Sequence, residues 1–398
     1  MSISANQLRK DIVRYAAMGD HRTASPVDLA TSDWICARLQ AVGFDARLDP
    51  WTLRQFQMRE AWVEIHGRRL EAFPLWHPKA LDTVEAAISE TPEPGQIGLV
   101  QFDDIMVTPK SDHAAKIEAM AERGAQAVIG CSPHESGEIY GQNVIPPHNQ
   151  VPWPLPVLMV APSDWHVLQD AANHGDALRA CLSGEDINDA SANNVVARLA
   201  RGNRWIIVST PQSGWFQCAG ERGAGVALLL ALADWAANSD LPQSFLFLSN
   251  SGHEIGHVGI HHLMEQDVLP APAQTDFWLH LGASIGTRGF AEDVYGVLRA
   301  AGPEPEAWLY GSPDLIDPLL QSFEGIEHLT PRVYDRKNGE IRWILERGYS
   351  AFALMGPQRH FHLASDGPEN VDAKLLQFVG RALVDMFQSR ARTCTQPT

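Results

Sequence analysis

Residues 245–259 read FLFLSNSGHEIGHVG, an apolar run followed closely by two histidines and a glutamate. The run has the length of a short buried strand, so His253 and Glu254 are expected just beyond the end of that strand. The sequence His253-Glu254-x-x-His257 also fits a motif in which two histidines on a helix bind zinc and the glutamate acts as a base. The two interpretations place the metal on different residues.

The helical interpretation is the weaker of the two. Gly256 lies inside the motif and costs a helix about 1 kcal/mol relative to alanine. The motif also starts after Ser-Gly at a strand end rather than within an established helix. The longer pattern with a third histidine fails as well, because it needs a histidine six residues after His257, whereas His261 and His262 come four and five residues after it. We therefore favour the strand-end interpretation.

Length and composition limit the class of protein. A chain of 398 residues predicts two domains, and 45% hydrophobic with 20% charged residues is typical of soluble globular proteins. The net charge of −17 with no basic cluster argues against nucleic acid and anionic membranes as partners, and no apolar run approaches eighteen residues. Five scattered cysteines and an N-terminus without the apolar core of a secretory signal predict a cytoplasmic protein.

The pattern of apolar residues divides the chain into three parts. We expect residues 1–66 to form the N-terminal part of a catalytic domain, with helices at 5–18 and 27–42 and a β-rich segment from Phe44 to His66. Residues 67–187 are richer in proline and contain a strand at 98–102 and a helix at 114–123, which predicts a smaller inserted α/β domain. Residues 188–398 form the remaining catalytic domain, with the following expected elements: strands 205–209, 245–248, 277–281 and 349–354, and helices 223–237, 256–266 and 373–387.

Strands separated by helices predict an α/β fold with a doubly wound, mainly parallel sheet. Ligands of such sheets bind at the carboxyl ends of the strands. Near those ends lie Glu221, Glu254 and His362. Three oxygen or imidazole ligands with one open position are the usual arrangement of a catalytic zinc ion.

At these positions the chain resembles the co-catalytic zinc aminopeptidases, a family that includes the glutaminyl cyclases. The resemblance runs from Asn193-Asn-Val-Val-Ala197 to the C-terminus, and the insert resembles a protease-associated domain. Glu221, four residues before Gly225, matches the bridging aspartate of the family. The family's Glu-Glu-x-Gly corner is His253-Glu254-Ile-Gly256 here, so Glu254 keeps the metal position and His253 takes the position of the general base.

The remaining matches concern residues further along the chain. His280 corresponds to a metal-binding aspartate, Glu340 to a further active-site aspartate, and His362 with Asp366 to the closing His-x-x-x-Asp. The opening His-x-Asp of the family is replaced by Thr210-Pro-Gln-Ser213, which offers no good metal ligand. The resemblance thus implies one divalent metal ion held by Glu221, Glu254 and His362, with Asp366 behind the ligands. Zinc fits this mixed set best, although manganese and iron accept the same ligand types.

Three kinds of function remain open. The first is hydrolysis of an amide bond in a small peptide or acyl-amino compound, with His253 as base, His280 and Glu340 as further catalytic groups, and Arg222, Arg359 and His360 contacting the substrate. The second is a non-hydrolytic lyase, cyclase or isomerase reaction in which His253 and His280 act as acid and base. The third is a binding protein without activity. Self-association of the chain is left open by the sequence.

Overall fold

The computed structural model describes residues 3–294, 297–335 and 338–393. Its internal contacts divide the chain into two compact units. Unit 1 comprises Met1–Trp51, Ser191–His253 and His257–Thr398, and unit 2 comprises Thr52–Ala190 and Glu254–Gly256. These limits differ from the predicted domain limits at 66/67 and 187/188, which stay predictions. The two long strands β1 (Asp45–Ile65) and β7 (Ala177–Leu199) each contain one of the new limits.

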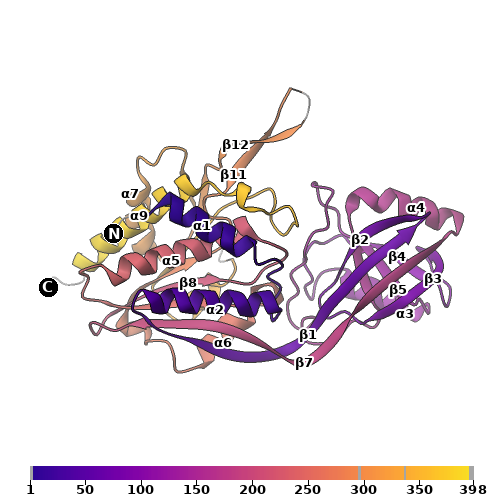
Figure 1. The fold of residues 1–398 in the computed structure, drawn as a ribbon, viewed down its shortest axis with the longest axis horizontal. Helices are drawn as coiled ribbons and strands as arrows, with labels where there is room; N and C mark the ends of the chain where they lie inside the picture. The colour runs from indigo at the N-terminus through magenta and orange to yellow at the C-terminus, as the bar shows by residue number, and fades with distance from the viewer. Residues whose placement is uncertain (1–2, 295–296, 336–337, 394–398) are drawn as a thin grey trace. The chain divides into compact units, whose positions relative to one another are not determined.

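Unit 1 is built on a mainly parallel sheet, as predicted (Figure 1). Strand β8 pairs in parallel with both β9 and β10, and β10 pairs in parallel with β15. The outer pairings are mixed, because β7 and β13 run antiparallel to β9 and β15, respectively, whereas β14 runs parallel to β13. The strands are β8 (Trp205–Pro211), β9 (Ser244–Asn250), β10 (Thr275–Leu281), β13 (Glu306–Gly311), β14 (Thr330–Val333) and β15 (Ala351–Met355).

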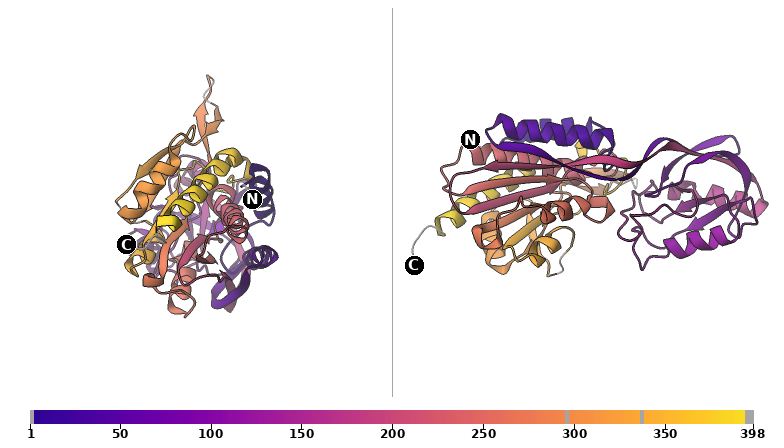
Figure 2. Two further views of the ribbon diagram at one scale, coloured as in Figure 1. Left: turned by 90° about the vertical axis from the view of Figure 1, so that its left-hand side faces the viewer. Right: turned by 90° about the horizontal axis from the view of Figure 1, so that it is seen from below.

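Helices cover both faces of this sheet (Figure 2, right). Alternate residues of a strand point to opposite faces, so Ile206 and Val208 pack in one apolar core while Ile207 packs in another. The first core contains α1 (Ala5–Ala16), α2 (Pro26–Ala41), α5 (Ala224–Ala237), α7 (Pro313–Phe323) and α9 (Ala373–Thr393). The second contains α6 (Val258–Glu265) and α8 (Ile341–Glu346). The doubly wound α/β prediction is confirmed.

Unit 2 contains a further set of mainly parallel strands with two α-helices. Its central strands β3, β4, β5 and β6 pair in parallel, and β2 and β7 border them in antiparallel pairings with β6 and β3. This is an α/β unit, and its identity as a protease-associated domain stays a prediction. The bounds are β2 (Arg68–Pro74), β3 (Leu81–Ser89), β4 (Ile97–Gln101), α3 (His113–Glu122), β5 (Ala127–Cys131), β6 (Val157–Val160) and α4 (Trp165–His174).

No helix in the described part of the chain has the length and apolar character needed to cross a bilayer. Cys36, Cys131, Cys181 and Cys218 are buried free thiols, and Cys394 lies outside the described residues.

Candidate functional site

The loops that follow the four parallel strands of unit 1 carry an unusual set of backbone conformations. Five residues other than glycine have a positive φ there: Phe216 and Cys218 after β8, His257 after β9, Ser284 after β10 and His362 after β15. Such left-handed conformations are costly for residues with a side chain and often accompany functional sites. The same loops contain most of the predicted site residues.

Glu221 is held in place by Asp366, which lies 145 residues further along the chain. Glu221 belongs to a π-helical turn, Ala219–Gly223, at the start of α5. The Asp366 carboxylate accepts hydrogen bonds from the backbone N–H groups of Gly220 at 3.0 Å and Glu221 at 2.9 Å. It also accepts one from Gln358 Nε2 at 3.0 Å. Asp366 thus holds the backbone of the Glu221 turn, and its role behind a metal ligand stays a prediction.

The Glu221 carboxylate is fully buried and lies close to a guanidinium and an imidazole. Its Oε1 lies 2.7 Å from the guanidinium of Arg222 and 3.2 Å from Nε2 of His362. Neither carboxylate oxygen makes a hydrogen bond of good geometry. Although burial alone would raise the pKa of Glu221, the charges of Arg222 and His362 lower it to about 2. Arg222 also donates from Nε to the backbone carbonyl of Ser213 at 3.1 Å and is only 1% exposed.

Glu340 connects the two other histidines expected to act as catalytic groups. Nδ1 of His253 lies 2.8 Å from Oε1 of Glu340, which also accepts a hydrogen bond from Asn250 Nδ2 at 2.8 Å. On the other side, Nε2 of His280 lies 3.9 Å from Oε2 of Glu340. Burial lowers the pKa of His253 well below its usual value and lowers that of His280 to about 4, so both imidazoles are neutral at pH 7.

The segment from His253 to His257 does not form one helix. His253–Ile255 is a single 3-10 turn, and α6 begins only at Val258. Gly256 and His257 between them have φ values of +90° and +62°. Because the helical zinc motif needs both histidines on one helix, this backbone excludes that interpretation. Glu254 is buried, and its backbone carbonyl accepts the N–H of Val144 within unit 2.

The structure also places the predicted substrate contacts. His360 lies in the loop after β15, with Nδ1 2.8 Å from Ser365 Oγ and its ring against Phe290. Arg359 precedes it and is half-buried, and Arg222 is buried beside Glu221. Their role toward a substrate stays a prediction.

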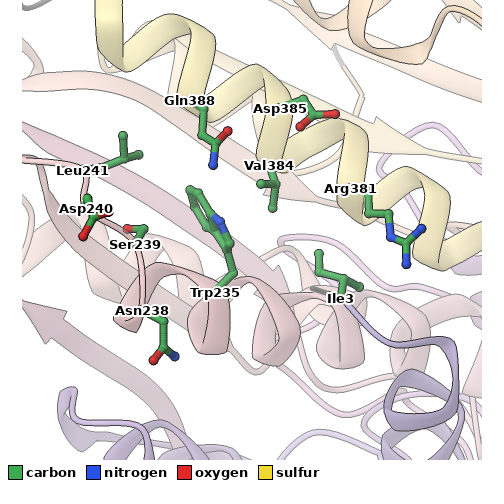
Figure 3. Close-up of a pocket in the computed structure, with 10 residues that line it drawn as sticks. All are labelled: Ile3, Trp235, Asn238, Ser239, Asp240, Leu241, Arg381, Val384, Asp385 and Gln388. Atoms are coloured by element: carbon green, nitrogen blue, oxygen red, sulfur yellow. The ribbon is translucent and has the colours of Figure 1, made fainter. Parts of the chain in front are cut away.

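A cavity of about 650 Å³ lies between α5 and α9 (Figure 3). Trp235, Val384 and Ile3 line it together with polar residues of α9 and of the loop after α5, and none of the predicted site residues does. We assign it no role.

Sequence reasoning missed several side chains that support the site. Ser209 Oγ lies 2.9 Å from Nδ1 of His280 and accepts the indole N–H of Trp278 at 2.7 Å. Trp343 donates from Nε1 to Nδ1 of His257 at 3.0 Å. Asn250 could have been found, because only Ser249 separates it from the apolar run at 245–248, whereas no local pattern singles out Trp343.

Within the described ranges, no three His, Cys, Asp or Glu side chains converge in the manner of a formed metal site. Glu221 and His362 are nevertheless a compatible pair. Two ligands of one tetrahedral zinc, each about 2.0 Å from it, lie roughly 3.3 Å apart. The separation of 3.2 Å between Glu221 Oε1 and His362 Nε2 is of this size.

No protein-family model matches the sequence, and no curated protein matches it. Solved structures match it over nearly the whole chain. A zinc aminopeptidase from Bacillus subtilis shares 14% identity over 97% of this chain and 95% of its own, with a TM-score of 0.76. A peptidase M28 precursor from Shewanella amazonensis shares 16% identity over 97% and 96%, with a TM-score of 0.68. A glutaminyl cyclase from Porphyromonas gingivalis shares 11% over 98% and 99%, with a TM-score of 0.52.

The match to the Bacillus subtilis structure leaves only a small share of the chain uncovered, and unit 2 is larger than that share. The similarity therefore includes residues of both units. These likenesses bear out the sequence-based resemblance at the level of the fold. The chain therefore has the α/β fold of the zinc aminopeptidases.

Proposed function

We propose that this chain is a metal-dependent hydrolase that cleaves an amide bond of a small peptide or acyl-amino compound. The observation that carries the proposal is the buried pair of Glu221 and His362 at the carboxyl ends of the parallel strands. A buried carboxylate without hydrogen bonds is costly unless a cation engages it. The guanidinium of Arg222 and Nε2 of His362 both lie near Oε1 of Glu221, so a metal ion bound between Oε1 and Nε2 would share that oxygen with Arg222.

The proposed ligands of one divalent ion, with zinc preferred, are Glu221, Glu254 and His362. When bound, the ion would lower the pKa of a coordinated water and polarise the substrate carbonyl. Asp366 fixes the backbone on which Glu221 stands. Thr210-Pro-Gln-Ser213 supplies no strong ligand for a second ion, and the guanidinium of Arg222 reaches from Glu221 to the backbone of Ser213. One ion is therefore proposed rather than two.

His253 is the proposed general base. Because a carboxylate only accepts hydrogen bonds, Nδ1–H of His253 donates to Glu340, which leaves Nε2 as the hydrogen-bond acceptor of the neutral ring. A carboxylate that fixes the tautomer and orientation of an imidazole in this way also stabilises the imidazolium formed after proton transfer. Arg359 and His360 are proposed to contact the substrate near the same loops.

The second candidate is a non-hydrolytic proton transfer, as in a cyclase, lyase or isomerase. One observation favours it: Glu340 lies between two imidazoles, His253 and His280, in a buried setting. Such a chain of groups can remove a proton at one histidine and return it at the other.

Metal analysis of the purified, dialysed protein is the first test. We expect one equivalent of metal in the wild type and a large loss in Glu221→Gln and in His362→Ala. His328→Ala is the matched control, because His328 is an exposed histidine of unit 1. Metal-free wild-type protein that does not bind added zinc would refute both enzymatic proposals. Two equivalents would refute the single site.

Activity then separates the two reactions. Release of anilide from aminoacyl anilides supports hydrolysis, whereas loss of ammonia from N-terminal glutaminyl peptides supports cyclisation. His253→Gln should lower kcat by about 10²- to 10⁴-fold with unchanged metal content. An unchanged kcat in this variant would remove His253 from the mechanism.

A further inference from the structure

A two-stranded ribbon stands apart from the rest of unit 1 (Figure 1; Figure 2, left). It consists of β11 (Arg288–Glu292) and β12 (Leu298–Pro303), which pair antiparallel with each other and with no other strand in the described part of the chain. We call the described residues 288–294 and 297–303 the arm. Its root is anchored, because the ring of Phe290 packs against His360 and Arg288 lies 3.5 Å from Asp372.

Several apolar side chains of the arm are exposed to solvent or only half-buried. None of its described residues is buried. Val294 is 92% exposed and Val297 is 48% exposed. Its other apolar side chains are Phe290, Ala291, Leu298, Ala300 and Ala301.

Such a ribbon is unfavourable in an isolated chain. Two-stranded hairpins are marginally stable in water, and an exposed strand edge with apolar side chains is a template for pairing with another chain. The usual protections are charged side chains or proline on the edge. Here Asp293 and Arg299 neutralise each other across the arm at 2.6 Å, and the only proline ends β12. A partner strand that pairs with the exposed edge of the arm would satisfy its backbone groups and cover its apolar side chains.

We propose that the arm is a dimerisation element whose β11 strand pairs antiparallel with β11 of a second copy of this chain. The charges on β11 select the second copy as the partner. In a two-fold pairing centred on Phe290, residue 288 of one copy faces residue 292 of the other. Arg288 then meets Glu292 twice, and Phe290 meets its own counterpart across the axis.

Glu292 is suited to this contact. It is exposed, and no ion pair engages it within the described residues. Arg288 keeps 35% of its side chain exposed while it borders Asp372. Opposite charges directly across a strand pair stabilise the pairing, and like charges weaken it. The pairing therefore predicts which charge changes will break the dimer and which combination will restore it.

Sedimentation velocity of the full chain over a range of concentrations tests the proposal. We expect a dimer for the wild type. Glu292→Lys and Arg288→Glu should each weaken dimerisation roughly tenfold or more, because each places like charges at two positions of the interface. An equimolar mixture of these two variants should dimerise again, because it contains only opposite-charge contacts. Glu122→Lys, the same charge change on exposed α3 of unit 2, should leave the dimer unchanged.

A variant in which Asn-Gly replaces residues 291–300 should be monomeric with the thermal unfolding midpoint of the wild-type monomer, because none of the described residues that it removes belongs to an apolar core. Three results would each overturn the proposal: a wild type that is monomeric throughout, a dimer that survives loss of the arm, or a charge-swapped mixture that fails to dimerise. The outcome does not depend on the proposed catalytic function, since no activity is measured.

Discussion

Asp366 offers a direct test of how the loop after β15 supports Glu221. Replacing Asp366 by alanine removes the acceptor of three hydrogen bonds, from the backbone N–H groups of Gly220 and Glu221 and from Gln358 Nε2. Asp366 is 1% exposed, so the two backbone groups lose their acceptor in a buried place. An unsatisfied buried donor costs about 1–3 kcal/mol. We therefore expect the free energy of unfolding to fall by about 2–6 kcal/mol, and by about half as much in Asp366→Asn, whose amide oxygen can still accept one N–H.

Denaturant unfolding followed by tryptophan fluorescence measures this loss. Asp385→Ala is the matched control, because Asp385 is an exposed aspartate on α9 whose loss should cost no more than about 0.5 kcal/mol. Metal binding by Asp366→Ala should weaken in parallel, since Glu221 would no longer be held. If the free energy of unfolding of Asp366→Ala equalled that of Asp385→Ala, the hydrogen bonds from the Glu221 turn to Asp366 would contribute nothing to stability.

Two further predictions concern histidines outside the proposed ligand set. Burial lowers the pKa of His21 from 6.5 to about 4, so the folded state favours the neutral ring, and the stability it contributes above pH 6.5 is lost as the pH falls toward 4. This pKa shift corresponds to about 3 kcal/mol. Between pH 7.5 and 4, the free energy of unfolding of His21→Gln should therefore fall by about 3 kcal/mol less than that of the wild type. An equal fall in both proteins would contradict the assignment. Trp343→Phe removes the donor to His257 Nδ1 while keeping an aromatic ring, and should cost about 1 kcal/mol in the same assay. A variant as stable as the wild type would show that this hydrogen bond contributes nothing.

Much of the fold could be predicted from local patterns. The strands at 205–209, 245–248 and 277–281 and the helix at 223–237 appear as β8, β9, β10 and α5. Their signals are strong because each element is buried in the sheet or against it, so its apolar residues form an unbroken run. No strand or helix was expected between residues 284 and 339, and the structure places the arm, β13, α7 and β14 there. These elements are short or partly exposed, so their apolar pattern is weak.

Only part of the candidate site could be predicted from local sequence patterns. The rule that ligands bind beyond parallel strands led to Glu221, His253 and His362 as strand-end residues. It could not show that Glu340 contacts His253, 87 positions earlier in the chain, or that Asp366 accepts hydrogen bonds from the backbone of the Glu221 turn. Those contacts join loops whose proximity depends on strand order, and strand order is not encoded in any local pattern.

The sequence by itself determined the alternation of buried strands and helices and the chemical character of the residues beyond the strand ends. It did so because helix and strand periodicity arise from neighbouring residues that share one buried face. Only the tertiary structure decided that His253 and His257 do not share a helix, since the positive φ at Gly256 and His257 breaks the backbone between them. Tertiary structure also decided which distant partners hold Glu221 and His253, because those contacts form only when the sheet brings its loops together.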